Sequence, residues 1–396
     1  MKKTVVFRSG TLAMGGLERI LVEVLQNIDR EKYNIVVIIE NDLGNDNVFL
    51  KDIPKEIMVY FLKTEEIINR TKYHRVRKKN IINKIMYNLL MMKERRIELR
   101  KIKEVIKTIG QIDIFIDFDC GGRKYIDKLD VGKKIAWSHG SIPKVLGGKA
   151  GKIQRNGENL KKYDTIVTIC DEMKEETKRI YPFLTDKIIR IYNPFNFERI
   201  IKLSMDEKDL TEQQKELMKE KYIVAVSRLD MVQKDYGTLI KAFKLLKERG
   251  VKEKLYIVGD GPGRDEIQSL INKNNLFEEV KLIGQTKNPY IWMKNSELFV
   301  HSSNYEGLPT VLIEALILNK VVVSSDCPTG PKEILKNGEC GFLYEIGDYK
   351  KLEEQLYRVL NDKLLSDELK KISVKRIEEF KIEPIMKEYG ILIEKR

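Results

Sequence analysis

The chain has 396 residues, of which 42% are hydrophobic and 34% are charged, and its formal net charge is +13. A chain of this length is too long to form one ordinary hydrophobic core, which predicts two domains. The apolar fraction excludes an intrinsically disordered chain. No apolar run approaches the roughly 20 residues of a membrane-spanning helix, and the four scattered cysteines form no close pair of the metal-binding kind.

The first half alternates short apolar runs with longer amphipathic ones, the pattern of strands and helices in turn. Arg8 interrupts the first apolar run, so we interpret that run as a strand and not as a signal peptide, and we expect free thiols in the cytoplasm. The predicted strands are Thr4–Arg8, Asn34–Ile39, Ile57–Phe61, Ile112–Ile116, Lys133–Trp137, Thr165–Ile169 and Lys187–Ile191. The predicted helices are Gly16–Asn27, Arg75–Thr108 with or without a break, and Glu172–Ile180 with Asp171 as its cap.

All of the excess positive charge lies in the first half. Residues 1–200 hold 40 Lys and Arg against 27 Asp and Glu, whereas residues 201–396 hold 33 of each. Residues 70–103 alone have 13 basic and two acidic groups, and their apolar residues recur at helical spacing. Such a helix can lie on an anionic membrane surface, where each nearby cation adds about 1 kcal/mol, or it can be a solvated helix packed on its own domain. We favour the membrane surface, because two acidic residues are too few for ordinary ion-pair lacing.

The second half repeats the alternation, with predicted strands at Tyr222–Val226, Leu255–Val258, Val280–Ile283, Leu298–His301 and Val321–Ser324. Strands that alternate with helices predict parallel sheets, so we expect an α/β chain of two Rossmann-like, doubly wound domains. We place these domains at residues 1–195 and 196–375, divided after the turn signal Asn193-Pro194. From Asp362 onward we expect one or two helices broken near Pro384, the last of them forming a C-terminal segment at 376–396.

Ligands of parallel sheets bind beyond the carboxyl ends of the strands, so the residues that follow each strand are the candidates for a site. Gly15 and Gly16 open the first helix, where the backbone can approach a phosphate, although a plain tight turn explains them equally well. His139 follows the fifth strand and is the best placed of the three histidines, although an isolated histidine more often has a structural role. His74 lies in the basic helix, and His301 lies within a buried strand.

Two cations, Arg228 and Lys234, follow the first strand of the second half. Both lie on one strand-to-helix loop and can grip a diphosphate, with ordinary surface charge as the alternative. Gly259 follows the next strand. The glycines around it indicate a tight turn, and their backbone could also face a ligand.

The most informative segment is Ser302–Leu316. Pro309 suits the first turn of a helix, Glu306 lies on the loop before it, and Glu314 lies inside it. The unpaired N–H groups at the helix start form an anion site between two carboxylates, which can accept hydrogen bonds from sugar hydroxyls. Because the segment has no local Lys or Arg, we expect a ligand to satisfy the two carboxylates.

Asp117 and Asp119 have a spacing that can hold a divalent metal against a nucleotide. Both carboxylates fall on one face of the predicted strand end. No other metal ligand is close in sequence, and the loop of Arg228 already supplies positive charge, so we expect no metal site.

These residues together resemble the retaining glycosyltransferases of family 4, which have the GT-B fold, and the resemblance covers nearly the whole chain. Its strongest element is the motif E-x7-E, matched by Glu306 and Glu314. The supporting elements are Gly15-Gly16, His139, Arg228 with Lys234, Gly259 in its glycine turn, and Asn193-Pro194 at the hinge. The resemblance implies two domains that face each other across a cleft, with a C-terminal helix that crosses back to the first domain.

The resemblance also implies catalytic and donor-binding roles. Arg228 and Lys234 would bind the diphosphate of the donor and stabilise it as it leaves, and Glu314 would bind the ribose. The sugar hydroxyls would be held by Glu306 together with the backbone of Gly307, Leu308, Pro309 and Thr310.

In the same family, His139 would contact the sugar from the other domain, and the base would lie near Ile283. Gly16 would let the first loop approach the phosphates and the acceptor. The resemblance implies no metal and no other cofactor, since the nucleotide-sugar is a substrate.

The run Ser325–Glu333 resembles family members that assemble bacterial surface polysaccharides such as capsule, O-antigen or wall glycan. We therefore expect a UDP-hexose or UDP-N-acetylhexosamine donor, a lipid-linked saccharide acceptor and a peripheral location on the inner face of the cell membrane. A nucleotide-sugar epimerase of the same architecture and an inactive lipid-surface scaffold remain alternatives. The interleaved basic and aromatic residues of a nucleic-acid surface are missing, so we expect no nucleic-acid partner.

Overall fold

The computed structural model describes residues 2–395 and divides the chain into two compact units. The first unit holds the residues up to Ile169, the segment Lys174–Pro194 and the segment from Ile385 onward. The second unit holds Cys170–Met173 and Phe195–Pro384. The main division therefore falls between Pro194 and Phe195, and residues 376–384 stay with the second unit instead of joining the predicted C-terminal segment.

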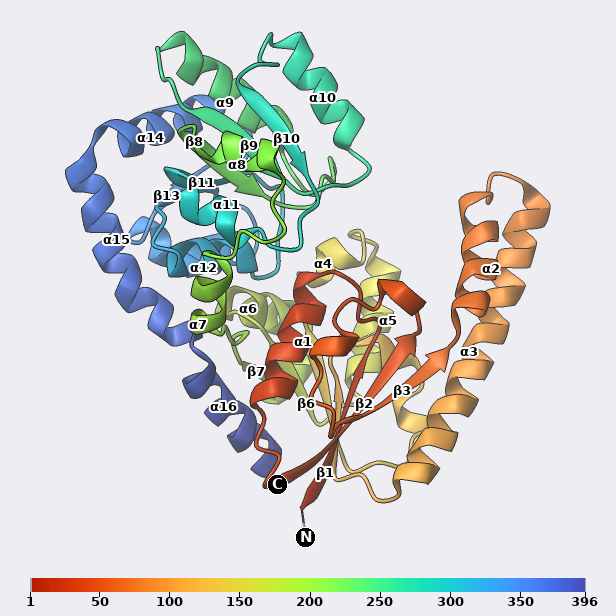
Figure 1. Cartoon of the computed structure of the whole chain (residues 1–396). Coiled ribbons are helices and arrows are strands. Elements are labelled where there is room, and N and C mark those ends of the chain that lie inside the picture. The colour runs from red at the N-terminus through yellow and green to blue at the C-terminus, as the bar shows by residue number, and fades with distance from the viewer. Residues whose placement is uncertain (1, 396) are drawn as a thin grey trace. The chain divides into compact units, whose positions relative to one another are not determined.

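The first unit is built on a parallel sheet of seven strands in the order β3-β2-β1-β4-β5-β6-β7. The central strands are buried on both faces, which is why they read as continuous apolar runs instead of alternating ones. Helices lie along the faces of this sheet (Figure 1). The strands are β1 Lys3–Ser9, β2 Tyr33–Asn41, β3 Met58–Lys63, β4 Ile114–Asp117, β5 Lys133–Ser138, β6 Thr165–Thr168 and β7 Ile188–Arg190.

The helices between these strands follow the predicted order. They are α1 Gly16–Asn27, α2 Glu65–Val76, α3 Ile81–Ile109, α4 Ile142–Val145, α5 Ala150–Leu160 and α6 Asp171–Ile180, with short 3₁₀ turns at Gly44–Asp46, Leu50–Asp52, Gly121–Lys124, Ile126–Lys128 and Pro182–Lys187. Asp171 is the first residue of α6 and not its cap, so that detail of the prediction is wrong. The long basic segment is broken into α2 and α3, and the Asn80 side chain caps α3 by accepting hydrogen bonds from the amides of Ile82 and Asn83.

The second unit has a parallel sheet of six strands in the order β10-β9-β8-β11-β12-β13. Five strands were predicted, and the sixth, β13, which has three residues, was missed. The strands are β8 Tyr222–Val226, β9 Lys254–Val258, β10 Val280–Gly284, β11 Leu298–His301, β12 Val322–Ser325 and β13 Phe342–Tyr344. The helices are α7 Phe197–Leu203, α8 Glu212–Met218, α9 Tyr236–Glu248, α10 Arg264–Lys273, α11 Tyr290–Asn295, α12 Thr310–Ile317, α13 Pro331–Ile334, α14 Tyr349–Asn361 and α15 Lys363–Ile377, with 3₁₀ turns at Lys336–Gly338 and Glu378–Phe380.

The last helix, α16 Ile382–Glu394, begins in the second unit and ends in the first. The break before it lies at Glu378–Phe380, and Pro384 sits within its first turn, where proline is tolerated. Tyr389 is fully buried and stacks on Trp137 of β5 with ring centroids 4.5 Å apart, and Lys133 Nζ donates to the Leu392 carbonyl over 2.9 Å. Among residues 2–395, no helix has both the length and the apolar character needed to cross a bilayer.

Candidate functional site

A polar cluster lies at the carboxyl ends of β8 and β11, which are neighbouring parallel strands of the second unit. The loop after β8 carries Lys234 and the loop after β11 carries Glu306. A backbone bridge between Lys234 and Ser303 joins the two loops, and the Asp235 amide donates to the Ser302 carbonyl over 3.0 Å. The sheet order thus brings together two loops that are far apart in the sequence.

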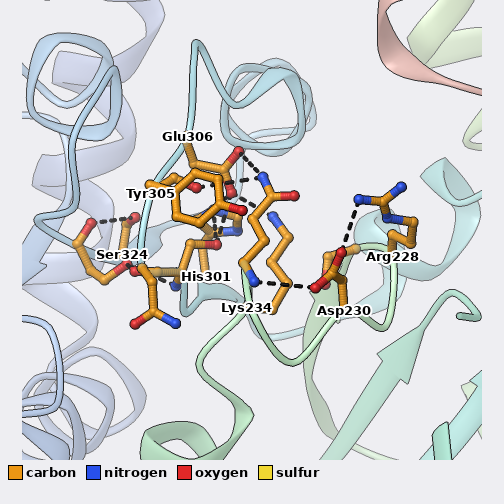
Figure 2. Close-up of polar contacts among 12 residues, drawn as sticks. Arg228, Asp230, Lys234, His301, Tyr305, Glu306 and Ser324 are labelled. Carbon is orange, nitrogen blue, oxygen red and sulfur yellow. Dashed lines mark hydrogen bonds and ion pairs between the residues drawn. The ribbon is translucent and has the colours of Figure 1, made fainter. Parts of the chain in front are cut away.

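The centre of this cluster is an ion pair between Lys234 Nζ and Glu306 Oε1, 2.5 Å apart, in which each side chain is only 9% exposed. The same carboxylate oxygen lies 2.8 Å from Ser303 Oγ and 3.2 Å from His301 Nε2. The other oxygen, Oε2, accepts a hydrogen bond from Gln233 Nε2 over 3.1 Å. In Figure 2, Lys234 from the loop after β8 and His301 from the end of β11 lie beside Glu306.

The electrostatics of the cluster keep Glu306 ionised. Burial on its own would raise the pKa of this carboxyl, but the Lys234 ammonium and the His301 hydrogen bond outweigh burial and lower the pKa to about 2. Burial, followed by the charge of Lys234, lowers the pKa of His301, so this imidazole is neutral at neutral pH. The cluster is therefore a carboxylate with one cationic and several neutral partners.

This arrangement corrects one expectation from the sequence. Glu306 does have a lysine partner, because the absence of Lys and Arg from its own segment says nothing about a loop 72 residues away. Sequence reasoning also missed Gln233, Ser303 and His301, the last of which was set aside as part of a buried strand. The spacing of His301 and Ser303, two residues apart at a strand end, places them on one face and was the available signal.

The loop that carries Glu306 is braced by the loop after β12. The Thr329 hydroxyl donates to the carbonyls of Glu306 and Gly307 over 3.1 and 2.9 Å, and the Glu306 amide donates to the Pro328 carbonyl. Leu308 and Pro309 are buried behind it. The helix α12 begins at Thr310, one residue later than predicted, and no side chain caps its start at Pro309. Its positive end therefore adjoins the cluster.

Glu314, the second carboxylate of the motif, lies within α12 and is half-buried. The Tyr290 hydroxyl of α11 donates to its Oε1 over 3.4 Å. The two carboxylates of the motif therefore have different partners.

Arg228 follows β8, but it lies outside the Lys234–Glu306 cluster. Its side chain is 67% exposed, and its Nη2 atom pairs with Asp230 Oδ2 over 3.1 Å (Figure 2). The Asp230 carboxylate also accepts the amides of Val232 and Gln233, which shapes the loop that leads to Lys234. The structure leaves the Arg228 guanidinium accessible to an anion from solution.

Gly259 lies where the ends of β8, β9 and β10 meet. Its φ is +138°, and a Cβ atom there would lie 2.0 Å from the Ser227 carbonyl oxygen, so only glycine fits. Its amide donates to the Gly284 carbonyl at the end of β10 over 2.9 Å. The requirement for glycine at position 259 is thus structural. Ile283, on the neighbouring strand β10, is half-buried.

In the first unit, Gly15 and Gly16 lie at the start of α1, where no side chain caps the helix. The Thr11 hydroxyl donates to Glu18 Oε1 over 2.7 Å, and a Cβ atom at Gly15 would lie 2.3 Å from Glu18 Oε2. The glycine therefore makes room for a carboxylate of the chain itself at this helix start.

His139 lines a cavity of about 260 Å³ within the first unit. The same cavity is lined by Asp119, Arg123 and the apolar side chains of Leu17, Ile142 and Leu146. Burial lowers the pKa of His139 to about 4, against the opposing effects of Asp119 and of a hydrogen bond with the Phe118 backbone. Its Nε2 atom is buried without a hydrogen-bond partner, so this imidazole is neutral and has one nitrogen free for a ligand.

Asp117 and Asp119 both bind the guanidinium of Arg8, which is fully buried at the carboxyl end of β1. Glu40 and Glu98 contact the same guanidinium. The Tyr163 hydroxyl donates to Asp117, and burial raises the pKa of this carboxyl to about 6. The two aspartates thus face an arginine within the protein.

Residues 206–376 match the family model described as "Glycosyl transferases group 1". The match covers less than half of the chain. The matched segment contains Arg228, Lys234, Glu306 and Glu314, so the polar cluster lies inside the matched residues.

Two curated relatives are similar to the chain. It is 34% identical over 260 residues to an uncharacterized glycosyltransferase of Methanocaldococcus jannaschii, an alignment that covers 58% of this chain and 63% of the relative. It is 34% identical over 181 residues to N-acetylgalactosamine-N,N'-diacetylbacillosaminyl-diphospho-undecaprenol 4-alpha-N-acetylgalactosaminyltransferase of Campylobacter jejuni, an alignment that covers 46% of this chain and 45% of the relative. The chain therefore spans less than two thirds of the length of these relatives.

Among solved structures, Anabaena HepE in complex with UDP and glucose matches over the whole of both chains, with a TM-score of 0.77 and 16% sequence identity. Together with the two parallel sheets, this likeness shows that the chain has the GT-B fold. The predicted fold class is confirmed.

Proposed function

We propose that the chain transfers a sugar from a nucleoside-diphosphate donor to a lipid-linked saccharide in the synthesis of a bacterial surface polysaccharide. The observation that carries this proposal is the buried Lys234–Glu306 pair at the start of α12, inside the segment that matches the glycosyl transferases. It offers an ammonium for a phosphate and an ionised carboxylate for sugar hydroxyls side by side. The donor is a UDP-hexose or a UDP-N-acetylhexosamine, which the UDP and glucose bound by HepE support.

The transfer proceeds with retention at the anomeric carbon, as the resemblance to family 4 implies. The bond between the anomeric carbon and the phosphate oxygen breaks, the acceptor oxygen forms a bond to the same face, and the departing phosphate takes the hydroxyl proton. Lys234, Arg228 and the N–H groups at the start of α12 oppose the negative charge that develops on the diphosphate. Since these groups already supply positive charge, we propose that the reaction needs no metal ion.

Glu306 and His139 have separate roles in this proposal. With a pKa of about 2, Glu306 is ionised at any physiological pH and accepts hydrogen bonds from the donor sugar. His139, as a neutral imidazole with a free Nε2 atom, is proposed to contact the reacting sugar. Glu314 is proposed to bind the ribose of the donor.

The relatives and the charge distribution support the proposed acceptor and location. The name of the Campylobacter jejuni relative includes a diphospho-undecaprenol acceptor, which supports a lipid-linked saccharide here. We propose that the enzyme works on the inner face of the cell membrane, to which the basic segment 70–103 binds.

A panel of nucleotide-sugars scored by thermal shift tests the donor proposal. A cognate donor at 100 times its dissociation constant adds about 2.7 kcal/mol of stability. We expect this gain for the unchanged chain and for Glu266→Gln, an exposed control on α10, and its loss in Glu306→Gln. If none of the nucleotide-sugars stabilises the chain, the proposal is wrong. If the bound sugar is epimerised without any acceptor, the epimerase alternative replaces transfer.

A further inference from the structure

The helices α2 and α3 pack against each other as a hairpin, and α3 also packs along β3, the edge strand of the first sheet. Figure 1 shows this pair beside the β3 edge, with the turn between the helices at its far end. The turn contains Arg77, Lys78, Lys79 and Asn80. The hairpin thus offers an outer surface that the sheet does not cover.

The charges of segment 70–103, the central part of this hairpin, are sorted by side, whereas Glu65, Glu66 and Glu104 outside this segment are exposed. All 13 basic residues of segment 70–103 are exposed, whereas its two acidic residues are buried. Glu94 pairs with Lys63 of β3 over 3.4 Å and accepts the Thr71 hydroxyl, and Glu98 pairs with Arg8 of β1 over 3.5 Å. The acidic groups therefore tie α3 to the sheet, and the outer surface of this segment presents positive charge only.

An apolar stripe runs along the outer side of α3. Ile82, Ile85, Leu89 and Met92 are spaced three, four and three residues apart, which places them on one face of the helix. They are 66%, 55%, 55% and 54% exposed. At about 100° per residue, Lys93 lies about 20° outside Ile82 on one side of this stripe, and Lys84 lies about 80° outside Met92 on the other side. Val76 and Ile81, on either side of the turn, are 70% and 73% exposed and extend the apolar surface to the hairpin end.

We infer that this hairpin is an interfacial anchor for an anionic lipid bilayer. This inference rests on the proposed function, because a lipid-linked acceptor is the reason for binding a membrane. The stripe lies in the boundary between headgroups and acyl chains, and Lys84 and Lys93 reach the lipid phosphates. A nucleic acid would satisfy the positive charge but would leave the stripe in water, so the apolar residues favour lipid. Because Glu94 and Glu98 tie α3 to β3 and β1, the anchor holds the first unit and not a loose arm.

Flotation with vesicles of phosphatidylglycerol and phosphatidylcholine tests the anchor on the full chain. We expect binding at low salt that weakens as the salt concentration rises, and little binding to phosphatidylcholine alone. The variant with Ile82→Ser, Ile85→Ser and Leu89→Ser should lose about tenfold or more of the vesicle partition coefficient. A matched control changes three exposed apolar residues of the second unit, Leu364→Ser, Ile372→Ser and Val374→Ser, and should bind as the unchanged chain does.

The outcomes separate the anchor from the activity. The stripe variant should keep its circular dichroism spectrum and its thermal shift with the cognate nucleotide-sugar, because neither depends on exposed residues of α3. If the stripe variant floats as well as the unchanged chain, or if the unchanged chain does not bind anionic vesicles at low salt, the anchor is wrong. If a short DNA duplex binds as tightly as the vesicles and the stripe variant retains both, the surface is a general polyanion surface and the anchor is likewise wrong. A failure of donor binding with intact flotation would overturn the proposed function alone.

Discussion

Removal of the Lys234 ammonium should destabilise the second unit and change how its stability depends on pH. The pKa of Glu306 is about 2 instead of 4.5, which corresponds to about 3 kcal/mol of stabilisation of the ionised carboxylate by its partners. Because the folded pKa is depressed, this stabilisation is present above the ordinary pKa and is lost as the pH falls toward 2. In Lys234→Met the burial of Glu306 remains while its cation is gone, so the pKa of Glu306 should rise above 4.5.

The expected cost of Lys234→Met is about 3–5 kcal/mol at pH 7, the range for a buried pair that loses one partner. The cost should shrink as the pH falls through the raised pKa of Glu306, because the neutral carboxyl is cheaper to bury. The chain has two tryptophans, Trp137 in the first unit and Trp292 in the second. Urea unfolding followed by Trp292 fluorescence in a Trp137→Phe background therefore reports on the second unit.

The control is an exposed pair of the same unit, Lys215 with Glu212, whose nitrogen and oxygen lie 2.7 Å apart. Lys215→Met should hardly change the urea midpoint, since exposed ion pairs contribute little. The double variant with Lys234→Met and Glu306→Gln should recover part of the stability that Lys234→Met loses. A cost below about 1 kcal/mol at pH 7, or a cost that is the same at pH 7 and pH 5, would refute the argument.

Three further predictions concern other parts of the chain. Arg8→Met should cost the first unit about 3–5 kcal/mol of stability, because it leaves four carboxylates without their shared cation. Urea unfolding with Trp137 as the reporter measures this cost. A loss of stability smaller than that for an exposed arginine would contradict the ion network. His139, with a pKa of about 4, should not titrate between about pH 5.5 and 8 in a proton NMR series. Since its pKa in the folded protein lies below the ordinary 6.5, this histidine should reduce the stability of the fold as the pH falls below 6.5. A titration midpoint near 6.5 would show that His139 is not buried. Gly259→Ala should cost about 2 kcal/mol or more in thermal unfolding, because the added Cβ meets the Ser227 carbonyl, and an unchanged melting temperature would contradict this packing.

The sequence was sufficient for the fold because the elements carry strong local signals. Central strands such as Val5–Phe7 are continuous apolar runs, and in parallel sheets such runs alternate with amphipathic helices. The errors were local. The three-residue strand β13 was missed, although the equally short β7 was predicted, and the start of α6 depended on whether Asp171 was a cap or a first residue. The break in the basic helix was left open, and Asn80 as a cap decides it in favour of two helices.

The site was predictable only where its residues share a segment. Glu306 and Glu314 stand eight residues apart, so their motif is visible in the sequence, whereas the partner of Glu306 is set by the pairing of β8 with β11. The same limit hid the ion pairs of Glu94 and Glu98, because burial depends on which side of α3 meets the sheet. Charge counts along the sequence cannot separate an inward from an outward side chain.

The path of α16 has a consequence for biosynthesis. The first unit is closed by residues after Pro384, where Tyr389 fills the space beside Trp137 and the Leu392 carbonyl binds Lys133. On the ribosome, the strands of this unit emerge early, but the residues that complete its core emerge only after the whole second unit has been translated. The first unit, although translated first, is therefore completed last. A chain that stopped at Pro384 would leave the Trp137 ring of the first unit without Tyr389 to cover it.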